Sequence, residues 1–250
     1  MANSPTGDSM AGRIVRVLEA FTAERTVLTA AEIGRHAGLP SSTAHRIVEE
    51  LVRTGLLERS EGGVRIGMRL WELAHRGSDA LRLRQAALPL MEAVQQQLRQ
   101  HSQLWVLEQD EALCLERLSH PAAGANLASV AGRLPLHASS AGAMLLAHAP
   151  AEVRRRILAG PLRRQTDETP VDAGELERVL DRARAEGIVV APGWMDPGST
   201  GVAVPLRDAE RVVAVLSVVL PRSMPTEPAA LVLRRATAAV GARLRASTGR

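Results

Sequence analysis

LTAAEIGRHAGLPSSTAHRIVEEL (residues 28–51) contains the signals for two short helices and the turn between them. Thr29 and Glu32 have the spacing of an N-terminal capping box. Gly38 is typical of the left-handed residue that ends a helix, and Ser41 is a predicted N-cap for the next helix. Two short helices joined by a glycine-containing turn predict a helix-turn-helix.

The second of these helices has an apolar face and a polar face. The apolar face consists of Ala44, Ile47, Val48 and Leu51. Small hydroxyls at the helix start and basic residues beyond them suit a helix placed in a DNA major groove. The predicted DNA contacts on this helix are Ser41, Ser42, Thr43, His45, Arg46 and Arg53. An ordinary helical hairpin with a solvated outer face would show the same pattern.

A hairpin is predicted directly after the second helix. Two short strand-like segments, residues 56–57 and 64–66, flank a Gly62-Gly63 pair, which favours a tight turn. Placed after a recognition helix, such a hairpin is the wing of a winged helix. Arg59 and Arg65 flank its tip, where a wing contacts backbone phosphates. The alternative is a structural hairpin with solvated arginines.

The length and composition point to an intracellular protein of two domains. A chain of 250 residues is too long for a lone DNA-binding module. Its single cysteine leaves no intramolecular disulfide, and no signal peptide or membrane-spanning run is visible, so we expect a cytoplasmic location. Residues 1–75 contain as many arginines as acidic residues. The placement of the arginines, and not the net charge, therefore argues for nucleic acid.

The fold class predicted for the whole chain is α+β. Residues 1–77 form a mostly helical winged helix-turn-helix, and residues 101–250 alternate hairpin-linked strands with helices, which predicts one antiparallel sheet with flanking helices. Residues 78–100 are assigned to a linker helix. The same helix would also suit a dimer contact or a part of the second domain.

Three stretches together resemble the IclR family of bacterial transcription regulators. They are the helix-turn-helix with its wing, GRLPLHASSAGAMLLA (132–147) and GVAVPLRDAERVVAVLSVVLP (201–221). The resemblance implies a winged-helix DNA-binding domain, a linker helix and a GAF-like effector-binding domain. It also implies dimers or tetramers and control by a small molecule, often an organic acid or aromatic compound. It places effector contacts at Ser140, Ala141, Gly201, Ser217 and Val219.

The residues themselves also indicate a pocket in the second domain. A helix beginning near Ser139 presents free N–H groups and the positive end of its dipole, which suit a carboxylate. Ser139 and Ser140 add hydroxyls, although serines here would also serve as helix caps alone. The predicted apolar walls are Leu134, Leu136, Val202, Val219 and Trp194. Ser217 is a polar residue in an apolar strand, and it either bonds its own backbone or faces a ligand.

The sequence departs from the family pattern in this pocket. Ala143 stands where relatives usually have a lysine, and the segment APGWMDPGS (191–199) replaces the usual cysteine and acids. Val64 also replaces the usual aromatic residue after the wing tip. We therefore expect a largely apolar effector with at most one carboxylate, because a second buried charge would lack partners.

Enzymatic motifs and metal-ligand spacings are absent from the sequence, so we predict no catalytic residue, metal or cofactor. The predicted function is an effector-controlled transcriptional regulator, repressor or activator. Its predicted partners are a double-stranded DNA operator, a small effector (an apolar mono-acid or aromatic) and a second copy of the chain. The alternative is a GAF-like protein with an enzymatic or partner-binding role, whose winged helix mediates protein contacts.

Overall fold

The computed structural model describes residues 9–76, 78–121, 123 and 128–248. The chain divides into two compact units, Met1–Asp79 and Ala80–Arg250. None of the helices in the described part of the chain has the length and hydropathy that a bilayer crossing requires.

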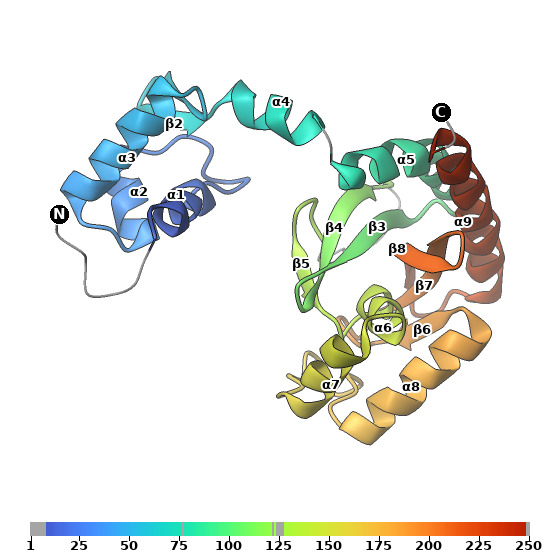
Figure 1. The fold of residues 1–250 in the computed structure, drawn as a ribbon. Coiled ribbons are helices and arrows are strands. Elements are labelled where there is room, and N and C mark those ends of the chain that lie inside the picture. The colour runs from blue at the N-terminus through green and yellow to red at the C-terminus, as the bar shows by residue number, and fades with distance from the viewer. Residues whose placement is uncertain (1–8, 77, 122, 124–127, 249–250) are drawn as a thin grey trace. The chain divides into compact units, whose positions relative to one another are not determined.

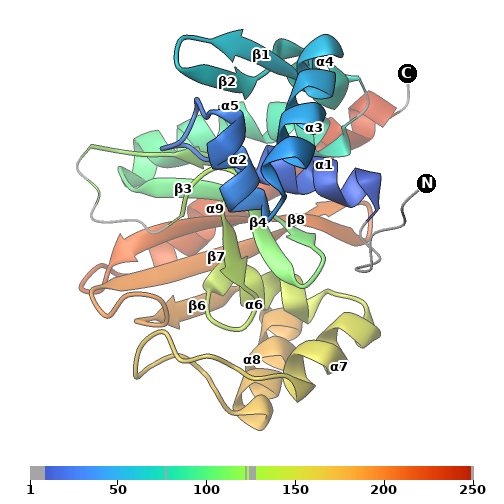
Figure 2. The ribbon, with the colours of Figure 1, turned by 90° about the vertical axis from the view of Figure 1, so that its left-hand side faces the viewer.

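The first unit has the predicted helix-turn-helix and hairpin. Its elements are α1 (Met10–Glu19), α2 (Ala30–Ala37), α3 (Ser41–Arg53), β1 (Leu57–Ser60), β2 (Gly63–Ile66) and α4 (Met68–His75). β1 and β2 pair antiparallel around the turn at Glu61-Gly62, next to the C-terminal end of α3 (Figure 2). The predicted winged helix is therefore the fold of this unit.

The helix ends follow the predicted signals, with one exception. Thr29 and Glu32 form the capping box at the start of α2, and Gly38 ends that helix with a left-handed φ of 63°. The prediction of Ser41 as an N-cap is wrong: Pro40 holds that position and Ser41 is the first helical residue. Pro40 already has the extended conformation that an N-cap requires (φ −54°, ψ 141°), so Ser41 falls inside the first turn.

The apolar face predicted for α3 is buried in the core of the first unit. Ala44, Ile47, Val48 and Leu51 are each at most 4% exposed. They face a core to which α1, α2, β1 and β2 also contribute, through Val17, Ile33, Leu57 and Val64 among others. Because the apolar face of α3 is buried in this way, its polar face is left open.

The second unit has one antiparallel sheet. Its elements are α5 (Asp79–Leu98), β3 (His101–Glu108), β4 (Glu111–Leu118), β5 (Arg133–Pro135), α6 (Ser140–Ala147), α7 (Ala151–Ala159), α8 (Ala173–Glu186), β6 (Val189–Pro192), β7 (Ser199–Asp208), β8 (Arg211–Pro221) and α9 (Glu227–Thr248). The strand order is β5-β4-β3-β8-β7-β6. α5 and α9 cover one face, and α6, α7 and α8 lie on the other (Figure 1).

α5 packs with the second unit. Leu83, Ala87, Met91 and Val94 are buried against the sheet face that α9 also covers. The boundaries that we expected at residues 77 and 100 stay predictions, since the compact units divide at Asp79 and not on either side of this helix.

Strand periodicity sorts the side chains of β3, β7 and β8 between the two faces. Leu104, Val202 and Leu216 point to the α5/α9 side, whereas Trp105, Ala203 and Val215 join the core under α6. Because alternate residues of a strand face opposite sides, the odd-numbered residues in these parts of the strands face α6. This face carries the second candidate site.

Candidate functional site

The outer face of α3 presents most of the predicted DNA contacts to solvent. Ser41, Ser42, His45 and Arg46 are exposed, and Thr43 is half-buried. Arg46 has no ion pair or hydrogen bond with any residue that the structure describes. Its guanidinium group is therefore available to a ligand without first breaking an internal contact.

The other predicted arginines are each paired with a glutamate: Arg53 with Glu50, Arg59 with Glu49 and Arg65 with Glu58, at N–O distances of 2.5, 2.7 and 3.2 Å. The sequence analysis did not predict these pairs. The Arg59–Glu49 pair connects the wing to α3. Because exposed ion pairs contribute little stability, each arginine can exchange its glutamate for a phosphate.

A pocket lies where α6 begins, above the odd-numbered side chains of the sheet. We call it the α6 pocket; about 570 Å³ of it, including its open mouth, is free of protein atoms. Six of the seven predicted effector residues line it: Ser139, Ser140, Ala141, Gly201, Ser217 and Val219.

The helix start at the α6 pocket is built as the sequence analysis expected. Ser139 is the N-cap of α6, and its Oγ accepts from Gly142 N at 3.0 Å. The N–H groups of Ser140 and Ala141 have no acceptor among the described residues. Ser140 Oγ lies directly over Gly201, where a Cβ would come within 2.6 Å of it. Two free backbone donors and a hydroxyl therefore meet at the positive end of the helix.

Leu136 and Val202 lie outside the pocket, so the prediction of these two as pocket residues disagrees with their positions. Leu136 is buried behind the first turn of α6: a Cβ on Gly142 would lie 2.7 Å from its Cα. Val202 is an even-numbered residue of β7 and faces α9. The predicted walls Leu134, Val219 and Trp194 do line the pocket.

Gln103 and Trp105 line the pocket and were missed. Trp105 Nε1 donates to Ser217 Oγ at 2.9 Å, and Ser217 Oγ donates to Gln103 Oε1 at 2.9 Å. Ser217 thus bonds two side chains of β3 and not its own backbone. Period-two alternation in residues 101–107 places Gln103 and Trp105 on one face, but the pairing of β3 with β8 carries no local sequence signal.

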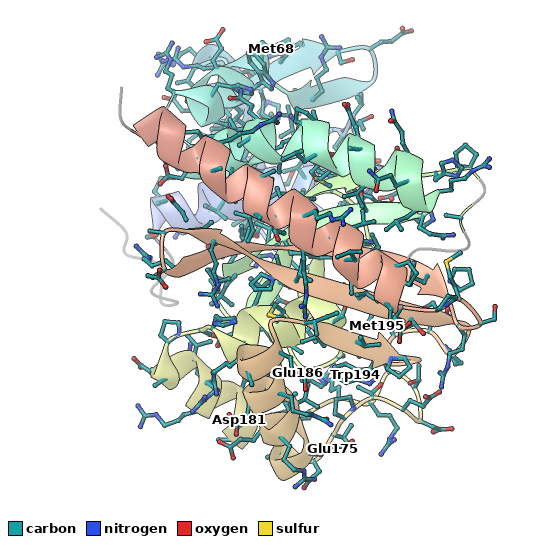
Figure 3. All side chains as sticks on the ribbon, turned by 90° about the vertical axis from the view of Figure 1, so that its right-hand side faces the viewer. Met68, Glu175, Asp181, Glu186, Trp194 and Met195 are labelled. Carbon is teal, nitrogen blue, oxygen red and sulfur yellow. The ribbon has the colours of Figure 1, made fainter. Side chains whose placement is uncertain are left out.

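The atypical loop between β6 and β7 supplies the remaining wall. Trp194 and Met195, labelled in Figure 3, and Asp196 line the pocket. Thr169 Oγ1 donates to the Trp194 carbonyl at 2.7 Å, which holds this loop in place. The loop therefore adds apolar surface together with one carboxylate.

Nothing in the described residues suggests nucleophilic or metal chemistry. Burial raises the pKa of the Cys114 thiol to about 11, so the thiolate is not the prevailing form at neutral pH. The described part of the chain contains no cluster of three or more histidine, cysteine or acidic side chains that could hold a metal ion.

Family models match both units. The model described as the IclR helix-turn-helix domain matches residues 11–61, and the model for the bacterial transcriptional regulator IclR C-terminal region matches residues 76–242. The chain belongs to the IclR family. Members of this family combine a DNA-binding helix-turn-helix with an effector-binding domain, and this chain is a transcriptional regulator of that kind.

Among its IclR-family relatives is a homologue from Microbacterium hydrocarbonoxydans, whose crystal structure was determined with 4-hydroxybenzoate. It is 56% identical, superposes with a TM-score of 0.92, and the match covers 95% of this chain and 100% of that one. The regulator XynR of Escherichia coli is 26% identical over 82% of this chain and 83% of its own length. The Pca regulon regulatory protein of Pseudomonas putida is 27% identical over 82% of this chain and 72% of its own length.

Proposed function

We propose that the effector of this regulator is an aromatic acid with one carboxylate, of the 4-hydroxybenzoate type, and that it binds in the α6 pocket. The observation that carries the proposal is the start of α6, where Ser140 and Ala141 line the pocket and their backbone N–H groups have no acceptor among the described residues. The carboxylate would accept from these N–H groups. The ring would lie against Trp194, Leu134 and Val219. The 56% identity to a protein that binds 4-hydroxybenzoate supports this assignment.

We expect 4-hydroxybenzoate to raise the melting temperature of the effector unit. A ligand at a hundred times its Kd stabilises the native state by about 2.7 kcal/mol. The measurement is a thermal-shift titration, with benzene-1,4-dicarboxylate as the matched control. The control should give a smaller shift, because its second carboxylate lacks a cationic partner among the described residues that line the pocket. A larger shift with the dicarboxylate would contradict the proposal.

We further propose that the chain binds its operator as a dimer or tetramer. One winged helix offers only the few base contacts of α3, so specific binding requires two copies. The operator should then be a near-palindrome whose half-site centres lie about 34–36 Å apart, or a multiple of that distance. Footprinting of the DNA upstream of the chain's own gene would test this. Protection of one asymmetric half-site by a monomer would contradict it.

We propose that the chain acts only as a regulator and has no catalytic role. We also propose that it acts in the cytoplasm, where the operator lies. The named relatives above are regulators or homologues of regulators, and the buried thiol of Cys114 offers no reactive group. A gel shift with the same upstream DNA separates this role from the alternative, in which the winged helix mediates protein contacts. Failure to bind that DNA at low salt would favour the alternative.

A further inference from the structure

Gln103 has a buried side-chain amide whose oxygen and nitrogen differ in their hydrogen bonding. The residue is 3% exposed and lines the α6 pocket. Its Oε1 accepts from Ser217, whereas its Nε2 is buried without a hydrogen-bond partner in the part of the chain that the structure describes. A buried donor without an acceptor is costly, and native structures rarely contain one without a reason.

The structure places this amide with its Oε1 toward Ser217, which also bonds Trp105. Trp105 Nε1 can only donate, so Ser217 Oγ accepts from it. The serine has a single hydroxyl hydrogen, and it donates that hydrogen to Gln103 Oε1. The chain of hydrogen bonds therefore runs from Trp105 through Ser217 to Gln103. It ends at Gln103, whose Nε2 has no acceptor among the described residues and can bond only to an acceptor.

Gln103 and the start of α6 lie at separate places in the pocket. Gly201, which lies beneath Ser140, pairs with Val219 on β8, and Gln103 pairs with Ser217 two residues further along. Gly201 and Gln103 are therefore two strand spacings apart across the sheet and two residues apart along it, roughly 12 Å in all. A ligand held by its carboxylate at α6 would present its opposite end to the Gln103 side.

We infer that Gln103 is a specificity-determining residue, whose Nε2–H donates to an acceptor oxygen at the end of the effector opposite its carboxylate. The inference rests on the proposed binding of an aromatic acid in the α6 pocket. A donor at this place would favour para-hydroxylated acids over acids that have no polar group at the end opposite the carboxylate.

The test compares 4-hydroxybenzoate, benzoate and 4-aminobenzoate on one protein by isothermal titration. The native chain should bind 4-hydroxybenzoate about tenfold or more tightly than benzoate, because benzoate leaves the buried donor unpaired. It should also prefer 4-hydroxybenzoate to 4-aminobenzoate, whose amino group is mainly a donor. In Gln103→Met the affinities for 4-hydroxybenzoate and benzoate should agree within about twofold. Gln103→Glu replaces the donor with an acceptor and should shift the preference toward 4-aminobenzoate.

Ratios of affinities on one variant cancel any loss of folding stability. Gln100→Met is the matched control, since Gln100 is buried but does not line the pocket, and it should keep the native preference. A uniform loss for all three acids in Gln103→Met, or an unchanged preference, would overturn the inference. Equal binding of 4-hydroxybenzoate and benzoate by the native chain would overturn it while leaving the proposed function intact. Binding of neither acid would overturn both.

Discussion

Replacing Arg46 with alanine is expected to weaken binding to the cognate operator by about 1–3 kcal/mol and to relax specificity at one base pair. Arg46 is exposed on the outer face of α3 and forms no hydrogen bond or ion pair with a described residue. A recognition helix enters the major groove with this face, and an arginine there bonds a guanine edge in bidentate geometry. Because the side chain is outside the core, the variant should fold normally. Binding to operators substituted at each position would measure both effects.

The wing offers the matched comparison for Arg46. Arg59→Ala should weaken cognate and unrelated DNA alike and lower the slope of log affinity against log salt by roughly one. Arg59 is paired with Glu49 in the free protein, so it would exchange this partner for a phosphate on binding. Unchanged cognate binding by Arg46→Ala would show that another residue of α3 contacts the bases. A loss restricted to the cognate site in Arg59→Ala would place the wing in a groove.

The DNA-binding unit could be predicted nearly completely because its signals are local. The capping box of Thr29 and Glu32, the left-handed Gly38 and the apolar face of α3 each involve residues a few positions apart. The ion pairs of Arg53, Arg59 and Arg65 were missed. The Arg59–Glu49 and Arg65–Glu58 pairs join residues ten and seven positions apart, and only the folded hairpin brings them together.

The α6 pocket could be predicted only in part. The helix start at Ser139 has a local signal, and the family resemblance indicated Gly201, Ser217 and Val219. Gln103 belongs to the site because β3 pairs with β8. This pairing joins residues more than a hundred positions apart in the sequence, and no local pattern specifies it. The error at Val202 has the opposite origin: strand alternation would have assigned it to the other face once Gly201 was placed in the pocket.

Replacing Ser140 with leucine is expected to abolish the thermal shift that 4-hydroxybenzoate produces and to leave operator binding intact. Ser140 is buried at the pocket wall, with its Oγ over Gly201, so a larger side chain has space only in the pocket itself. It would occupy the position of the ligand carboxylate and cover the free N–H of Ala141. The helix predicted to contact DNA, α3, belongs to the other compact unit, so the substitution does not touch its fold.

Ser140→Ala is the control, because it removes the hydroxyl but leaves the space and both backbone donors. It should keep most of the thermal shift, since the N–H groups at the positive end of α6 remain free to bind the carboxylate. Loss of the shift in both variants would mean that the hydroxyl, and not the backbone, holds the acid. A full shift in Ser140→Leu would mean that the carboxylate lies elsewhere. The melting temperature of each variant without ligand shows whether the leucine has also disturbed the packing of α6 on β7, because overpacking a buried site destabilises it.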